Sequence, residues 1–167
     1  MGGSGAFATG AHDRGHDTPR AVGHDKVAAR FARYSDTSGY NRVINLRQFG
    51  GAATDLARAT ARPFLPDSVL EPDTTYRDQL VVDIGDTSFE FNHCLGETGD
   101  RTWTWVPKHK MISAGDQFIW MFPNCGNPQK VQRYPLEWAE SLRPWQPRKP
   151  NCSYQPMACP LLAHGLR

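Results

Sequence analysis

The sequence predicts an α/β protein in which a mixed, mainly antiparallel sheet is covered by helices. Apolar and polar residues alternate in several short segments, which are typical of half-buried strands. These segments lie at 80–84, 88–93, 102–106 and 111–114, and a helical pattern follows at 127–142. Strands joined by short turns pair antiparallel, and a helix can then bury one face of the sheet. The 167 residues, 39% of them hydrophobic, suffice for one domain with a real core.

The amino-terminal part predicts short elements. Residues 1–19 are rich in glycine and polar side chains, so we expect a poorly ordered segment or a frayed helix there. A short buried strand is expected at 20–24. A helix over 26–34 should follow, because its apolar residues share one helical face, with Asp25 as the N-cap.

Glycine and proline predict loops on both sides of the sheet-forming region. An irregular loop is expected over 39–51, followed by a short helix from position 54 or 55 to Arg62, which Pro63 ends. Residues 144–167 form a proline-rich tail. We expect its first part, 144–160, to lack regular structure. The expected main domain therefore covers 20–143.

The central strands carry side chains with a clear facial pattern. Phe89, Phe91 and His93 should lie on one face of their strand, and Trp103 and Trp105 should lie together on one face of theirs. Residues 107–110 predict the turn of a hairpin, and Pro135 is expected to divide the helix that follows.

Two carboxylates stand just after strands, each preceded by a glycine that permits a sharp turn. Glu97 follows the strand at 88–93, and Asp116 follows the strand at 111–114. Because these strands are separated by a single hairpin, their ends can converge. Carboxylate oxygens at such a point suit divalent cations. The alternative interpretation is that both are solvated turn residues.

Charge and cysteine content exclude several classes of partner. The chain has 19 basic and 17 acidic side chains, a balance that predicts neither nucleic acid nor an anionic membrane as a partner. No apolar run approaches the roughly 20 residues of a membrane span. The four cysteines form no metal-binding pattern and no secretory signal is recognisable, so we expect reduced thiols and a cytoplasmic protein.

Two sequence runs resemble the third and fourth metal motifs of the metallo-β-lactamase superfamily. They are Gly-Glu-Thr-Gly-Asp-Arg-Thr-Trp-Thr-Trp-Val-Pro at 96–107 and Ile-Ser-Ala-Gly-Asp at 112–116. The run at 118–139, with Pro-Asn-Cys-Gly-Asn-Pro-Gln-Lys-Val-Gln-Arg-Tyr at its centre, resembles a branch related to alkyl sulfatases. Segments between 30 and 49 resemble the middle of the same proteins. The likeness covers about 20–143 and implies a partial αββα sandwich of the metallo-β-lactamase type.

The resemblance implies a metal-dependent hydrolase of esters or sulfate esters that uses a metal-bound hydroxide. Asp116 matches the carboxylate that bridges two metals, and Glu97 matches a position usually held by a histidine ligand. His164, in Leu-Ala-His-Gly, resembles a late histidine ligand. The implied cofactor is a divalent metal, with zinc favoured over iron or manganese.

One family motif, His-x-His-x-Asp-His, does not occur in the sequence. The nearest pattern pairs His12 with His16, whose spacing of four residues does not match. We therefore expect an incomplete hydrolase that is weakly active or inactive as this chain alone. The alternative is a non-catalytic remnant or interaction module that keeps part of the fold.

Four residues are candidates for binding a small-molecule ester or sulfate ester. Trp120 could form an apolar wall beside the metals, although a core role is the alternative. Asn124, Lys130 and Arg133 could hold an anionic group, although a solvated surface helix is the alternative. A sheet that lacks part of its fold exposes edges, so we also expect a homodimer or poor solubility.

Overall fold

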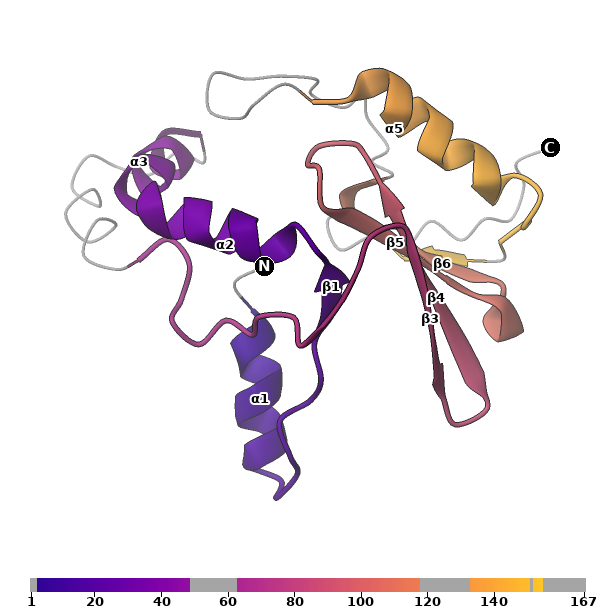
Figure 1. Ribbon diagram of the computed structural model, residues 1–167, viewed down its shortest axis with the longest axis horizontal. Helices are drawn as coiled ribbons and strands as arrows, with labels where there is room; N and C mark the ends of the chain where they lie inside the picture. Colours follow the sequence, from indigo (N-terminus) through magenta and orange to yellow (C-terminus); the bar gives the residue numbers. More distant parts are fainter. Residues whose placement is uncertain (1–2, 49–62, 118–132, 151, 155–167) are drawn as a thin grey trace. The chain divides into compact units, whose positions relative to one another are not determined.

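The computed structural model describes residues 3–48, 63–117, 133–150 and 152–154. The chain divides into two compact units, Met1–Thr75 and Tyr76–Arg167 (Figure 1). Among the described residues, no helix has the length and apolar character that a membrane span requires.

The described residues of the first unit form three helices and a small two-stranded sheet, whose second strand ends at Tyr76. The helices are α1 (Ser4–His12), α2 (Val27–Asp36) and α3 (Ser38–Gln48), and the sheet pairs β1 (Val22–His24) with β2 (Thr74–Tyr76). The predicted strand near 20–24 and the helix near 26–34 are therefore present. Helix α1 packs closely, since an added Cβ at Gly5 would lie only 2.1 Å from the carbonyl oxygen of Ser68.

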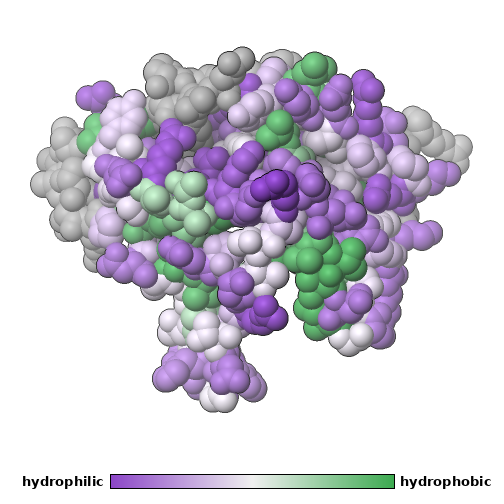
Figure 2. All heavy atoms as spheres, viewed as in Figure 1, coloured by the Kyte–Doolittle hydropathy of each residue, from purple (hydrophilic) through white to green (hydrophobic). Residues whose placement is uncertain are grey.

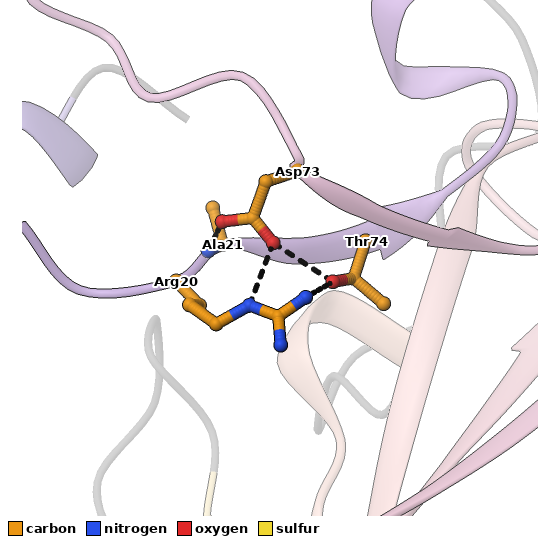
Figure 3. A network of polar contacts seen from close by, with 4 residues as sticks. All are labelled: Arg20, Ala21, Asp73 and Thr74. Carbon is orange, nitrogen blue, oxygen red and sulfur yellow. Dashed lines mark hydrogen bonds and ion pairs between the residues drawn. The ribbon is translucent and has the colours of Figure 1, made fainter.

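A polar network joins the start of β1 to the start of β2 (Figure 3). Asp73 accepts hydrogen bonds from the backbone N–H of Ala21 at 2.8 Å and from Nε of Arg20 at 3.2 Å. The Arg20 guanidinium also donates to the Thr74 hydroxyl at 2.5 Å. The Ala21 hydrogen bond is the main reason that the pKa of Asp73 is lowered, followed by the Thr74 hydroxyl. The network therefore fixes the entry of both strands into their pairing.

Two local predictions in this unit are wrong. The segment from Ser38 to Gln48 is helical rather than an irregular loop. Long-range contacts outweigh the poor helix propensity of Gly39, because Ile44 is buried and the Arg42 guanidinium donates to the carbonyl of Pro63 at 2.9 Å. Asp25 is not the N-cap of α2, since that position belongs to Lys26. The predicted helix over 54–62 lies outside the described residues.

The second unit is built on a five-stranded sheet in the order β3-β4-β5-β6-β7. Strands β3 to β6 form an antiparallel meander, and β7 pairs parallel with β6. Their bounds are β3 (Gln79–Ile84), β4 (Thr87–Cys94), β5 (Arg101–Val106), β6 (Met111–Ser113) and β7 (Cys152–Tyr154). The four predicted strands are confirmed. Strand β7 lies where a proline-rich loop was expected.

One face of this sheet forms the core of the unit. Trp103, Trp105 and Ile112 are buried on it, and Trp145 of the short helix η3 (Arg143–Trp145) packs against them. The predicted shared face of the two tryptophans is therefore confirmed. Trp145 lies with its ring centroid 5.7 Å from that of Trp103.

The opposite face of the sheet is apolar and half-buried. Leu80 pairs with Phe91 across the β3–β4 ladder, and Val82 pairs with Phe89. Apolar residues gather over this hairpin in the space-filling view (Figure 2).

Helix α5 (Pro135–Leu142) lies in the described segment 133–150. It begins at Pro135, and the part of the predicted helix over 127–132 lies outside the described residues. A proline is tolerated at the first helical position, because the N–H that it lacks would have no partner in the helix. Trp138 is the buried side chain that anchors α5 to the sheet unit.

Candidate metal-binding site

Glu97 lies in the connection between β4 and β5, and a crowded glycine sets its position. A Cβ added at Gly96 would lie 2.8 Å from Oε1 of Gln117 and 3.3 Å from both the Arg101 Cδ and the Trp138 ring. The backbone N–H of Tyr134 donates to the carbonyl of Gly96 at 3.2 Å. The backbone before Glu97 is thus packed against three elements, which fixes where the carboxylate begins.

Asp116 lies in the short helix η2 (Gly115–Gln117), directly after β6. Gly115 has a φ of +54°, a left-handed conformation that glycine adopts at little cost. The turn expected from the sequence therefore follows the strand, and the Asp116 carboxylate lies beside Arg101 at the start of β5.

The two predicted carboxylates converge on one cation, the guanidinium of Arg101. Its Nη2 lies 3.6 Å from Oε2 of Glu97 and 3.4 Å from Oδ2 of Asp116. The Arg101 side chain is only 10% exposed, compared with 20% for Glu97 and 33% for Asp116. We call Glu97 and Asp116 the carboxylate pair. Because the pair shares one buried positive charge, its two members are electrostatically coupled.

A second buried arginine binds only one member of the carboxylate pair. Nη2 of Arg133 donates to Oε1 of Glu97 at 2.6 Å, and its side chain is 7% exposed. This short charge-assisted hydrogen bond holds one carboxylate oxygen of Glu97, while the ion pair with Arg101 involves the other. The predicted role of Arg133 in binding substrate remains a prediction, and the structure adds that its guanidinium already engages Glu97.

The Arg101 guanidinium also lies against an aromatic ring of α5. Its central carbon is 5.5 Å from the centroid of the Trp138 ring, within the range of a cation–π contact. The Trp138 indole N–H donates to the carbonyl of Gln117 at 2.7 Å. Helix α5 is therefore tied to the residue next to Asp116, and it forms one wall beside the arginine.

The carboxylate pair supplies some of the ligands that a divalent metal requires. Carboxylate oxygens are suitable ligands, so the carboxylate pair fits a metal in its chemistry. In the part of the chain that the structure describes, however, no group of three or more His, Cys, Asp or Glu side chains could hold a metal ion. His93 is the histidine nearest to Glu97 in the sequence, and its Nε2 lies 3.1 Å from the carbonyl oxygen of Gly99. The described residues thus supply part of a metal site.

Four of the seven predicted site residues lie outside the described residues: Trp120, Asn124, Lys130 and His164. Arg101, which contacts both carboxylates, was not among the predicted site residues. Strand alternation could have found it, because Arg101 shares a face with Trp103 and Trp105 and so must point toward the core. A charged residue on a buried face needs a partner of opposite charge.

Comparisons with known proteins concern the fold. No protein-family model matches the chain, and no curated protein matches it. A metallo-β-lactamase family protein from Thermus thermophilus has a similar solved structure, with a TM-score of 0.59 and 16% identity. The match covers 93% of this chain but 52% of that protein, so the chain spans about half its length. A metallo-β-lactamase from Pontibacter korlensis matches with a TM-score of 0.49 and 17% identity over 90% of this chain and 66% of that one. The Thermus thermophilus match shows that the chain has the α/β fold of metallo-β-lactamase family proteins, with a mainly antiparallel sheet and covering helices.

Proposed function

We propose that this chain is part of a metal-dependent hydrolase of the metallo-β-lactamase superfamily, in the branch related to alkyl sulfatases. The observation that carries the proposal is the carboxylate pair, because Glu97 and Asp116 approach one point from two separate connections. Two carboxylates that were only solvated turn residues would not be expected to meet around the same buried charge. The resemblance of the runs at 96–107 and 112–116 to metal motifs of this superfamily supports the same proposal.

The carboxylate pair would hold a divalent metal, with zinc favoured and iron or manganese as alternatives. Such an ion acts as a Lewis acid and lowers the pKa of bound water, which suits hydrolysis of an ester or sulfate ester. Glu97 and Asp116 would supply oxygen ligands, and His164 would supply a nitrogen ligand. Arg133 and Lys130 would attract an anionic substrate group, which Asn124 and Trp120 would help to orient.

We further propose that this chain alone is weakly active or inactive. It lacks the His-x-His-x-Asp-His motif, which would provide most ligands of a two-metal site. Loss of groups that merely orient ligands typically lowers metal affinity or activity 10–100-fold, and loss of ligands themselves costs more. Full activity would then require ligands from further sequence or from another polypeptide.

Metal analysis of purified protein tests the proposal. In equilibrium dialysis against Zn²⁺ or Mn²⁺, we expect weak but saturable binding of metal that Glu97→Ala and Asp116→Ala each abolish. Asp86→Ala is a matched control, because Asp86 is a surface carboxylate paired with Lys108. Metal that persists in both site variants, or is lost equally in the control, would contradict the proposed site.

The second candidate function is a non-catalytic remnant or interaction module. It is favoured by the two buried arginines, which already balance the carboxylate pair without a metal. A well-folded, metal-free protein in the same experiment would select this alternative.

A further inference from the structure

We propose that Arg101 acts as an internal cation for the carboxylate pair, so that Arg101 and a metal exclude each other at this site. The inference rests on the proposed function for its metal part. It concerns how the chain controls the site, because a side chain of the protein itself would set the affinity for metal.

The first support is the position of the guanidinium. A single nitrogen, Nη2 of Arg101, contacts one oxygen of Glu97 at 3.6 Å and one of Asp116 at 3.4 Å. A metal bound to both oxygens would need distances of about 2.0–2.6 Å to each of them. Because Nη2 already contacts both of these oxygens, we expect a metal to displace the guanidinium and not to bind beside it.

The second support is electrostatic. Two carboxylates near each other in a partly buried site repel unless a positive charge lies close by. Arginine remains protonated in proteins, so Arg101 supplies that charge permanently. Arg133 does not do the same, because it contacts Glu97 but no ion pair joins it to Asp116 among the described residues. Within the same described segments, Arg101 is the side chain that bridges the pair.

The third support is that Arg101 makes no short bond to the carboxylate pair. The guanidinium is the end of a flexible side chain, and the two ion-pair distances are longer than the 2.6 Å bond of Arg133. Its other terminal nitrogen, Nη1, makes no hydrogen bond to any described residue. Displacement of the Arg101 guanidinium would break the two ion pairs but no short hydrogen bond to the described part of the chain.

The first experiment tests the internal cation without metal. Thermal unfolding is measured in buffer with a chelator for wild type, Arg101→Met, and the double variant Arg101→Met/Asp116→Asn, which leaves the bond between Glu97 and Arg133 in place. We expect Arg101→Met to unfold at a lower temperature, because the carboxylate pair keeps its charges and loses its cation. The double variant should regain part of the loss. An Arg101→Met protein as stable as wild type, or a double variant no more stable than Arg101→Met, would overturn the inference.

The second experiment tests the exclusion. Zn²⁺ and Mn²⁺ are titrated by calorimetry into wild type, Arg101→Met and Arg133→Met. We expect Arg101→Met to bind at least tenfold tighter than wild type, and this gain should disappear when Asp116→Asn is added. Arg133→Met removes the same charge but leaves the bridging cation, so its gain should be clearly smaller. Equal affinity in wild type and Arg101→Met, or an equal gain in Arg133→Met, would overturn the exclusion.

The two experiments separate the inference from the proposed function. If no variant binds either metal at the carboxylate pair, the proposed metal site fails, and with it the exclusion. The unfolding series then still decides whether Arg101 is the internal cation of the pair. If wild type and Arg101→Met bind equally and both site variants abolish binding, the proposed function stands and the exclusion fails.

Discussion

Gly96 shapes the carboxylate pair through the space that it leaves free. The nearest atoms to an added Cβ belong to Gln117, Arg101 and Trp138, which are the neighbour of Asp116, the bridging cation and the anchor of α5. Gln117 is 1% exposed and its amide donates to the Ser141 hydroxyl, so it has little room to shift. A side chain at position 96 would therefore disturb the whole arrangement around Glu97.

We expect Gly96→Ala to lower the free energy of unfolding by about 1–3 kcal/mol, the usual range for overpacking a well-filled site. The measurement is chemical denaturation followed by tryptophan fluorescence. Gly99→Ala is the matched control, because the nearest atom to its added Cβ is the Tyr134 hydroxyl at 4.0 Å. An equal loss in the two variants would argue against crowding as the cause.

Cys94 illustrates how burial at the end of β4 controls chemistry. Burial raises the pKa of its thiol to about 12 from an ordinary value of 9.0, although the charge of Arg101 acts in the opposite direction. The neutral thiol is thus the form that the folded protein favours. Since the thiolate is the nucleophile, Cys94 should be inert in the folded protein at neutral pH.

The sign of the pH effect follows from the raised pKa. Below about pH 9 the thiol is neutral in both the folded and the unfolded chain, and the protein keeps the full stability of this buried group. As the pH rises from about 9 toward 12, the Cys94 thiol ionises in the unfolded chain but stays neutral in the folded one, and this contribution to stability is lost. We expect the unfolding temperature of wild type to fall more steeply over this range than that of Cys94→Ala. Parallel pH profiles would contradict a strongly raised pKa.

The β3 strand carries exposed apolar side chains at an edge of the five-stranded sheet. In the described part of the chain it pairs only with β4, so it forms an edge of the five-stranded sheet. Val81 and Ile84 on this strand are 53% and 66% exposed. An apolar edge of this kind is a template for pairing with another chain.

We propose that two copies of the chain associate through this edge. Val81→Lys should weaken self-association at least tenfold, because a charge on an edge strand opposes strand pairing. Leu136→Lys is the matched control, since Leu136 is 66% exposed but lies on α5. The measurement is analytical ultracentrifugation over a range of concentrations. A monomeric wild-type protein would contradict the proposal, as would equal weakening by the control.

On the scale of the whole molecule, the fold corresponds to about half of a larger metallo-β-lactamase family protein. Its five-stranded sheet has one face covered by α5 and η3, and the other face carries half-buried Leu80, Val82, Phe89 and Phe91. An apolar sheet face is stable when another layer covers it. This arrangement agrees with the expected partial αββα sandwich.

The sequence by itself determined the strand meander and the two carboxylates at strand ends. Alternation of apolar and polar residues follows directly from the two-residue period of a strand, and glycine marks the turns that follow. Both signals are local, so they can be read without knowing which segments meet. Helix α3 was missed because its stability comes from the burial of Ile44 and the bond of Arg42 to distant Pro63, and its own propensity is low.

Only the tertiary structure decided what lies between the two carboxylates. Spacing along the chain brought Glu97 and Asp116 to neighbouring connections, but it could not reveal that Arg101 and Arg133 reach the same point. Arg133 is separated from Glu97 by 36 positions, and the hydrogen bond between them forms only when the segment before α5 folds back onto the β4–β5 connection. Coulomb attraction depends on distance in space and not in sequence, so the charge balance of the site is a property of the fold.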